Sequence, residues 1–238
     1  MCRVTKKVPV FVFCLICIAP LPAFAAEIQA GAASSGLTFT KTSGSWIVYK
    51  KNNKIIAENT ALKVKKTIFK DVEKDDDEKH YEIASLVGPV LSVMKYLYWE
   101  GGAHPGHLAR LETINLDTVK SPVLLTDIFP EKQIVSALLK DKVVKKSLGS
   151  KIPKTIAEIT KMADGGCEIR YYEINESFAF HHTKGDKVAV RIGLPHGCEA
   201  MRGNYTELGI YLPKPVQLSE FLDEARKGKT LQSDFLGK

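Results

Sequence analysis

The chain has 238 residues, of which 26% are charged and 8% aromatic, and its formal net charge is +7. This positive balance comes without the clustered aromatic and basic residues typical of nucleic-acid surfaces, so we expect no nucleic-acid partner. The chain is long enough for one sizeable domain or two closely packed small ones.

Residues 1–25 have the pattern of a secretory signal peptide. Arg3, Lys6 and Lys7 form a basic head, residues 8–22 are nearly all apolar, and Ala23 to Ala25 supply the small-x-small pattern that signal peptidase reads. The apolar core is about a dozen residues long, short of the roughly 20 that a spanning helix needs. We therefore expect cleavage near Ala25, a periplasmic or secreted protein, and no stable membrane anchor.

The first half of the remaining chain reads as a series of strands. Residues 37–49 alternate around a turn at Ser43 to Ser45, which predicts a hairpin. Further strands are expected over residues 54–56, 61–69, 81–87, 90–99 and 107–117, because these runs are rich in β-branched and aromatic residues or alternate strictly. The charged run from Lys70 to His80 has no calcium-loop spacing and is expected to be a solvated loop.

The period changes near Asp127. Pro130 suits the first turn of a helix, and apolar residues then recur at helical spacing to about Leu148, before Gly149. A second helix is expected from Pro153 to Met162. Lysines occur along both expected helices. Lysine is ordinary on the outer face of an amphipathic helix, and a specific anion site there is the alternative.

The last third returns to strands and ends in a helix. Strands are expected over residues 167–174, 177–182, 187–194 and 208–213, and a helix over residues 219–227. Strands with a helical insert favour an α+β fold, an antiparallel sheet with two or three helices packed on it. We expect a β-rich subdomain over residues 26–105 and an α+β subdomain over residues 106–238, packed together as one unit.

Two cysteines, Cys167 and Cys198, remain once the signal peptide is removed. In an oxidising compartment they are expected to pair. The bridge would close a loop of about 30 residues, for which the chain-entropy model gives roughly 3 to 4 kcal/mol. Two buried thiols are the alternative.

Histidines in two glycine-containing loops raise the question of a metal site. His104 and His107 lie in the stretch "EGGAHPGH" and His196 in "PHGCE", but no HExxH or other compact ligand pattern is present. Gly101 and Gly102 can take positive φ and Pro105 stiffens a strand-to-strand connection, so a structural role is expected for this loop. We predict no catalytic residue, no metal and no cofactor. The candidate binding residues are Trp99, Glu100, His104, His107 and His196.

The order of residues from Ser92 to Phe129 resembles a known family. Tyr98, Gly101, Gly102, Ala103 and His104, followed by Asn115, Asp117, Leu125, Asp127 and Phe129, are similar to the motifs of an exported bacterial domain of unassigned function. That domain occurs in the extracellular part of the anti-sigma factor RsiV and in the N-terminal region of the peptidoglycan deacetylase PdaC.

The resemblance implies a domain that acts outside the cytoplasm without an established catalytic centre, and that in one branch binds lysozyme. We therefore expect an exported, non-catalytic envelope protein that binds a protein partner such as lysozyme, or a peptidoglycan fragment. The alternative is a metal-assisted hydrolase of cell-wall material that uses His104, His107 and His196.

Overall fold

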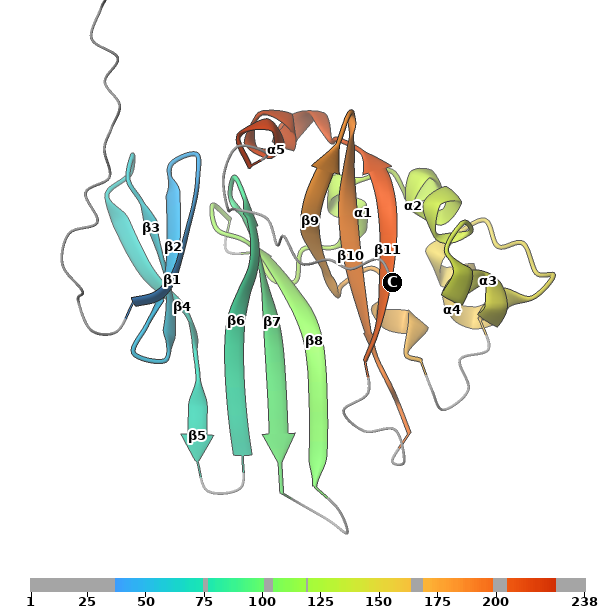
Figure 1. Ribbon diagram of the computed structural model, residues 1–238, viewed down its shortest axis with the longest axis horizontal. Helices are drawn as coiled ribbons and strands as arrows, with labels where there is room; N and C mark the ends of the chain where they lie inside the picture. Colours follow the sequence, from blue (N-terminus) through green and yellow to red (C-terminus); the bar gives the residue numbers. More distant parts are fainter. Residues whose placement is uncertain are drawn as a thin grey trace, which may run out of the picture. The chain divides into compact units, whose positions relative to one another are not determined.

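The computed structural model describes residues 37–74, 77–100, 105–118, 120–163, 169–198 and 205–225, all within one unit formed by residues 35–238 (Figure 1). The expected signal peptide lies outside the described residues. Three antiparallel sheets and a group of short helices make up this unit. Within the described part of the chain, no helix combines the length and the apolar character needed to span a membrane.

The first sheet contains β1 (Leu37–Ser43), β2 (Trp46–Lys51), β3 (Lys54–Asn59) and β4 (Val64–Lys70), in that order. The expected hairpin is confirmed, because β1 and β2 pair around the turn at Gly44. Asn52 and Asn53 both have positive φ, 48° and 58°, which is the requirement of a tight two-residue hairpin turn between β2 and β3. The sheet is buried on one face only.

The second sheet contains β5 (Val72–Lys74), β6 (Asp77–Val87), β7 (Val90–Trp99) and β8 (Gly106–Asn115). The charged run from Lys70 to His80 is therefore not a loop over its described residues, and that prediction was wrong. The Asp71 carboxylate is buried there and accepts a bond from the Tyr81 N–H at 2.9 Å, which holds the start of β5 against β6. The expected subdomain boundary at residue 105 lies between β7 and β8, which pair along their whole length.

Four short helices follow the second sheet: α1 (Leu125–Ile128), α2 (Glu131–Leu138), α3 (Lys142–Leu148) and α4 (Ile156–Met162). The single helix expected as far as Leu148 is thus divided into α2 and α3. The Asp141 side chain accepts bonds from the backbone N–H groups of Val143 and Val144 at 2.8 and 3.1 Å, and so caps a new helix after the break. Ile156 and Ile159 of α4 are buried as expected.

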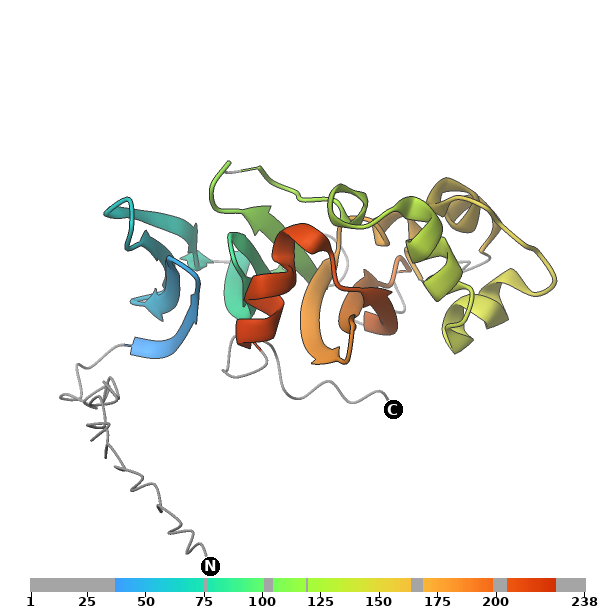
Figure 2. The ribbon, with the colours of Figure 1, turned by 90° about the horizontal axis from the view of Figure 1, so that it is seen from above.

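The third sheet contains β9 (Phe178–Lys184), β10 (Lys187–Pro195) and β11 (Tyr205–Pro213), with β10 in the middle. Residues 167–174 were expected to be a strand, but the described part, residues 169–174, contains the 3-10 helix η1 (Tyr171–Glu173). Tyr171 and Ile174, three residues apart, are both buried, which fits the three-residue repeat of such a helix. The chain then passes through η3 (Val216–Leu218) into α5 (Ser219–Ala225), which contacts β1 and β6 (Figure 2).

The apolar core consists of three clusters between these layers. One cluster joins the first sheet to the second through residues such as Trp46 and Leu91. A smaller one joins the second sheet to the third through Met94, Leu111 and Ala179. The largest lies between the third sheet and the helices, and includes Phe178, Phe180, Ile134, Leu138 and Ile159.

The expected fold class was wrong. The protein is mostly β, with 49% strand and 23% helix, and its described residues form three antiparallel sheets rather than one sheet covered by helices. Patterns of alternation identify strands, but they do not say how the strands divide among sheets. That division follows from which apolar faces pack together in space.

Candidate functional site

Three of the sequence-predicted binding residues lie at the ends of β7 and β8. Trp99 is partly exposed and packs over Gly106, the residue opposite it in β8. The Tyr98 hydroxyl donates to the Glu100 carboxylate at 2.6 Å, and the Tyr98 ring lies 4.8 Å from the ring of exposed His107. Pro105 is exposed beside them. Trp99, Glu100 and His107 therefore share one aromatic strand end, and their binding role stays a prediction.

His196 does not join that group. His196 follows β10 in the third sheet, where its Nε2 lies 2.7 Å from the Thr206 Oγ1 of β11. Gly101, Gly102, His104 and Cys167 lie outside the described residues. Cys198 is buried, and its pairing with Cys167 stays a prediction. Among the described side chains, no group of three His, Cys, Asp or Glu residues could hold a metal ion.

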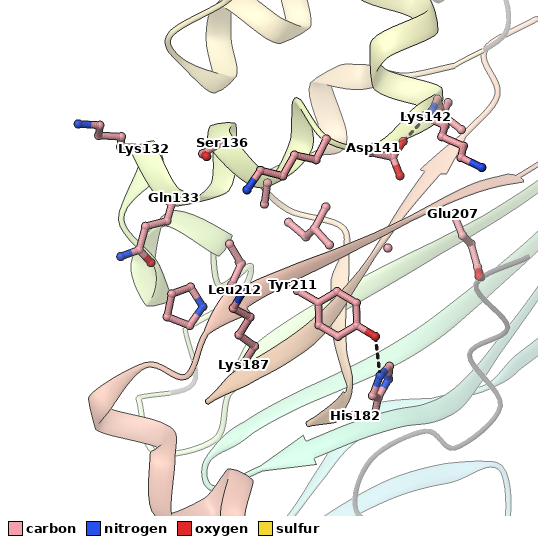
Figure 3. Close-up of a pocket in the computed structure, with 16 residues that line it drawn as sticks. Lys132, Gln133, Ser136, Asp141, Lys142, His182, Lys187, Glu207, Tyr211 and Leu212 are labelled. Atoms are coloured by element: carbon pink, nitrogen blue, oxygen red, sulfur yellow. Dashed lines mark hydrogen bonds between the residues drawn. The ribbon is translucent and has the colours of Figure 1, made fainter. Parts of the chain in front are cut away.

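A groove of about 1140 Å³ lies elsewhere, between β11 and the helices α2 and α3 (Figure 3). Lys132, Gln133 and Ser136 of α2 line one side, together with Asp141 and Lys142 at the start of α3. The other side consists of β11 from Glu207 to Pro213, with His182 and Lys187 from the neighbouring strands. Buried Ile134 and Leu138 hold α2 in place beside the strand.

Local sequence explains why β11 can line this groove. Leu208, Ile210 and Leu212 are buried against the helices, whereas Gly209, Tyr211 and Pro213 are exposed on the opposite face. Because β11 is the end strand of its sheet, residues from both faces reach the groove along the strand edge. The groove therefore follows an open sheet edge.

The charge of the groove is positive. Lys132, Lys140, Lys142 and Lys187 line it, all four are exposed, and none forms an ion pair with another described residue. The acidic side chains of the groove are already engaged: Asp141 caps α3, and Glu207 forms an ion pair with Arg191. Four uncompensated ammonium groups thus surround a concave surface, which attracts anionic ligands.

Aromatic side chains complete the strand side of the groove. The His182 Nε2 lies 2.9 Å from the Tyr211 hydroxyl (Figure 3), and the Lys184 ammonium lies 5.8 Å from the centre of the Tyr211 ring. Tyr211 is 44% exposed, so part of its side chain is accessible to a ligand. The ring and the hydroxyl can both contribute contacts.

Two buried polar groups, on Tyr205 and Glu173, lie outside the lining of the groove. Burial raises the pKa of the Tyr205 hydroxyl, to which the charge of Glu207 adds. Tyr205 therefore stays protonated at neutral pH. Burial likewise raises the pKa of the Glu173 carboxyl, against the opposing effect of Arg110.

Sequence reasoning noted the lysines of the helices but not the groove. Their helical spacing fits an ordinary exposed face, and no local pattern shows that the same lysines line one groove with Lys187, which is 45 residues beyond Lys142 in the chain. The break at Asp141 was the one available signal, because an N-cap residue there begins a second helix with its own direction.

No protein-family model matches the chain, and the search of curated proteins found no match either.

Proposed function

We propose that this chain is an exported, non-catalytic protein that binds an acidic ligand in the groove between α2, α3 and β11. The N-terminal basic head, apolar run and small-x-small pattern support export. The observation that carries the proposal is the set of four lysines without ion-pair partners among the described residues, on a surface whose two carboxylates are engaged elsewhere.

The geometry favours binding by several moderate contacts. Each exposed charge pair contributes about 0.2 to 1 kcal/mol, so four lysines favour a weak, reversible complex that weakens further as salt is added. An acidic protein segment and an anionic cell-wall polymer both satisfy this charge requirement. Lysozyme, the partner that the family resemblance implies, is a third ligand to be tested.

The direct experiment measures binding of a fluorescent heptaglutamate peptide to the purified chain by anisotropy, with heptaglutamine as the uncharged counterpart. Replacing Lys132, Lys140, Lys142 and Lys187 with glutamate is expected to weaken binding about thirtyfold or more, because each attraction becomes a repulsion. Raising the ionic strength should weaken binding to the unaltered chain.

A matched control variant has the same net charge as the variant with the four groove lysines replaced. Lys51, Lys54, Lys63 and Lys70 are exposed lysines of the first sheet and its turns, and their replacement with glutamate should leave affinity within about threefold, because charges beyond a Debye length are screened. Equal losses in the two variants would contradict a groove site. Lysozyme binding that survives reversal of the groove lysines would place that partner on another surface.

A further inference from the structure

We infer that the ligand is an extended acidic segment of a partner protein, which pairs with the open edge of β11 as an added strand. This inference rests on the proposed function and specifies its ligand. It follows from the backbone of β11, from the shape of its edge and from the placement of lysines on both sides of that edge.

The backbone of β11 presents unpaired groups to the groove. The Gly193 N–H of β10 donates to the Ser177 carbonyl, on the β9 side, at 2.8 Å. Because the backbone N–H and C=O groups of successive residues point to opposite sides of a strand, those of Val190 and Ile192 point toward β11. These residues stand opposite Ile210 and Leu208. The Lys214 N–H donates to the Asp186 carbonyl, which continues the same alternation.

The N–H and C=O groups of Glu207, Gly209 and Tyr211 therefore point away from β10, toward the groove. Within the described residues, no other strand pairs with this edge. An extended peptide can use all six groups in a ladder, as in other cases of strand addition. A glycan offers no matching alternation of donors and acceptors.

The edge is shaped for close approach. Gly209, at the centre of the open stretch, has no side chain to obstruct another backbone. Pro213 lacks an N–H group, and it marks the end of the strand without leaving a further donor unpaired. Three outward residues of β11 span about five positions of a paired strand, so a peptide of about seven residues covers the site.

The lysines lie on both sides of the added strand. In Figure 3, Lys132 and Lys142 belong to the helix side of β11, and Lys187 belongs to the opposite side, near Tyr211. Successive side chains of an extended peptide point to opposite faces. Consecutive acidic residues in the ligand would therefore meet lysines alternately on the two sides. A ligand with acidic residues on one face only would meet the lysines of one side.

The test uses heptaglutamate peptides carrying two backbone N-methyl groups, so that the protein is not altered. Methyl groups on two adjacent central residues place one methyl toward β11 in every register, and binding should weaken about tenfold or more through lost hydrogen bonds and a steric clash. Methyl groups on two central residues separated by one leave a complete ladder in one register, and affinity should stay within about threefold.

Amide hydrogen exchange supplies a second readout. Bound heptaglutamate should slow exchange at Glu207, Gly209 and Tyr211, whereas Leu208 and Ile210, already paired with β10, should change little. Lysine-dependent binding with equal affinity for the two methylated peptides and no added protection would overturn strand addition while the proposed function stands. Binding of heparin in the groove without binding of the peptide would do the same. Failure of the peptide and heparin to bind would overturn both.

Discussion

Two sheet edges of this protein carry lysine in different ways. On β4, the end strand of the first sheet, Lys65, Lys66 and Lys70 belong to the edge strand itself. On β11, the end strand of the third sheet, the stretch from Tyr205 to Pro213 contains no lysine, and the lysines come from the facing helices and from β10. The edge strand itself carries the lysines in the first sheet, whereas neighbouring elements carry them in the third sheet.

This difference has a physical consequence. Lysines on an edge strand discourage another strand from pairing with it, because the incoming backbone must displace or desolvate the charged side chains. Lysines set back across a groove leave the edge accessible and attract acidic segments to it. The same residue type thus protects one edge and equips the other for binding.

The largest expected effect concerns the wall that creates the β11 groove. Leu138 of α2 is fully buried, so Leu138→Ala should lower the free energy of unfolding by about 2 to 5 kcal/mol and should also weaken peptide binding. Urea denaturation checks the first result. Leu62→Ala, at a side chain 69% exposed beside β4, is the control and should change stability little. Similar losses of stability in the two variants would contradict this difference between the buried wall of the groove and the exposed residue beside β4.

The contact between the first sheet, which ends in β4, and the second sheet depends on a buried carboxylate. Asp71 lies 2.6 Å from the Lys50 ammonium and 3.0 Å from His80 Nδ1, and it accepts a bond from Tyr81. Asp71→Asn leaves the largely buried Lys50 without its counterion, which should lower stability by about 3 kcal/mol. Groove binding by the folded variant should be unchanged. A loss below about 0.5 kcal/mol would contradict this role for the carboxylate.

The cap residue Asp141 separates charge from structure within the groove. Asp141→Asn retains a capping oxygen and removes a negative charge, so thermal stability should hold while heptaglutamate affinity rises a few fold. Asp141→Ala removes the charge and the cap, and should lower the free energy of unfolding by about 1 kcal/mol. Anisotropy and thermal melts distinguish the two effects. An unchanged affinity in Asp141→Asn would show that the groove is not the binding surface.

The smallest effect is a dependence on pH at Glu173, a buried acid away from both edges. Because its pKa is raised on folding, the unfolded chain releases this proton first as pH increases, and the folded state then holds more protons. The contribution of Glu173 to the unfolding free energy therefore falls with rising pH above the ordinary range of a glutamic acid. Glu173→Gln should remove that fall in a series of denaturant titrations from pH 4 to pH 8. An identical pH profile would contradict it.

Much of the local structure could be predicted from the sequence. The turn at Gly44, the pairing of the strands before and after Gly88, and the inward residues Ile156 and Ile159 follow from turn chemistry and apolar period. Errors arose where a tertiary contact decided the outcome. The charged run became strand because Asp71 finds buried partners, and residues 171–173 became a 3-10 helix because Tyr171 and Ile174 both enter the core.

The sequence by itself determined most of the local elements, because strand alternation, helix caps and turn residues act over a few neighbouring positions. Only the tertiary structure decided how the strands divide into three sheets and which lysines share a groove. Lys142 and Lys187 are far apart in the chain, and they line one groove because Leu138 and Ile210 are buried in the same core. Packing of apolar faces, which no short pattern encodes, therefore places the candidate site.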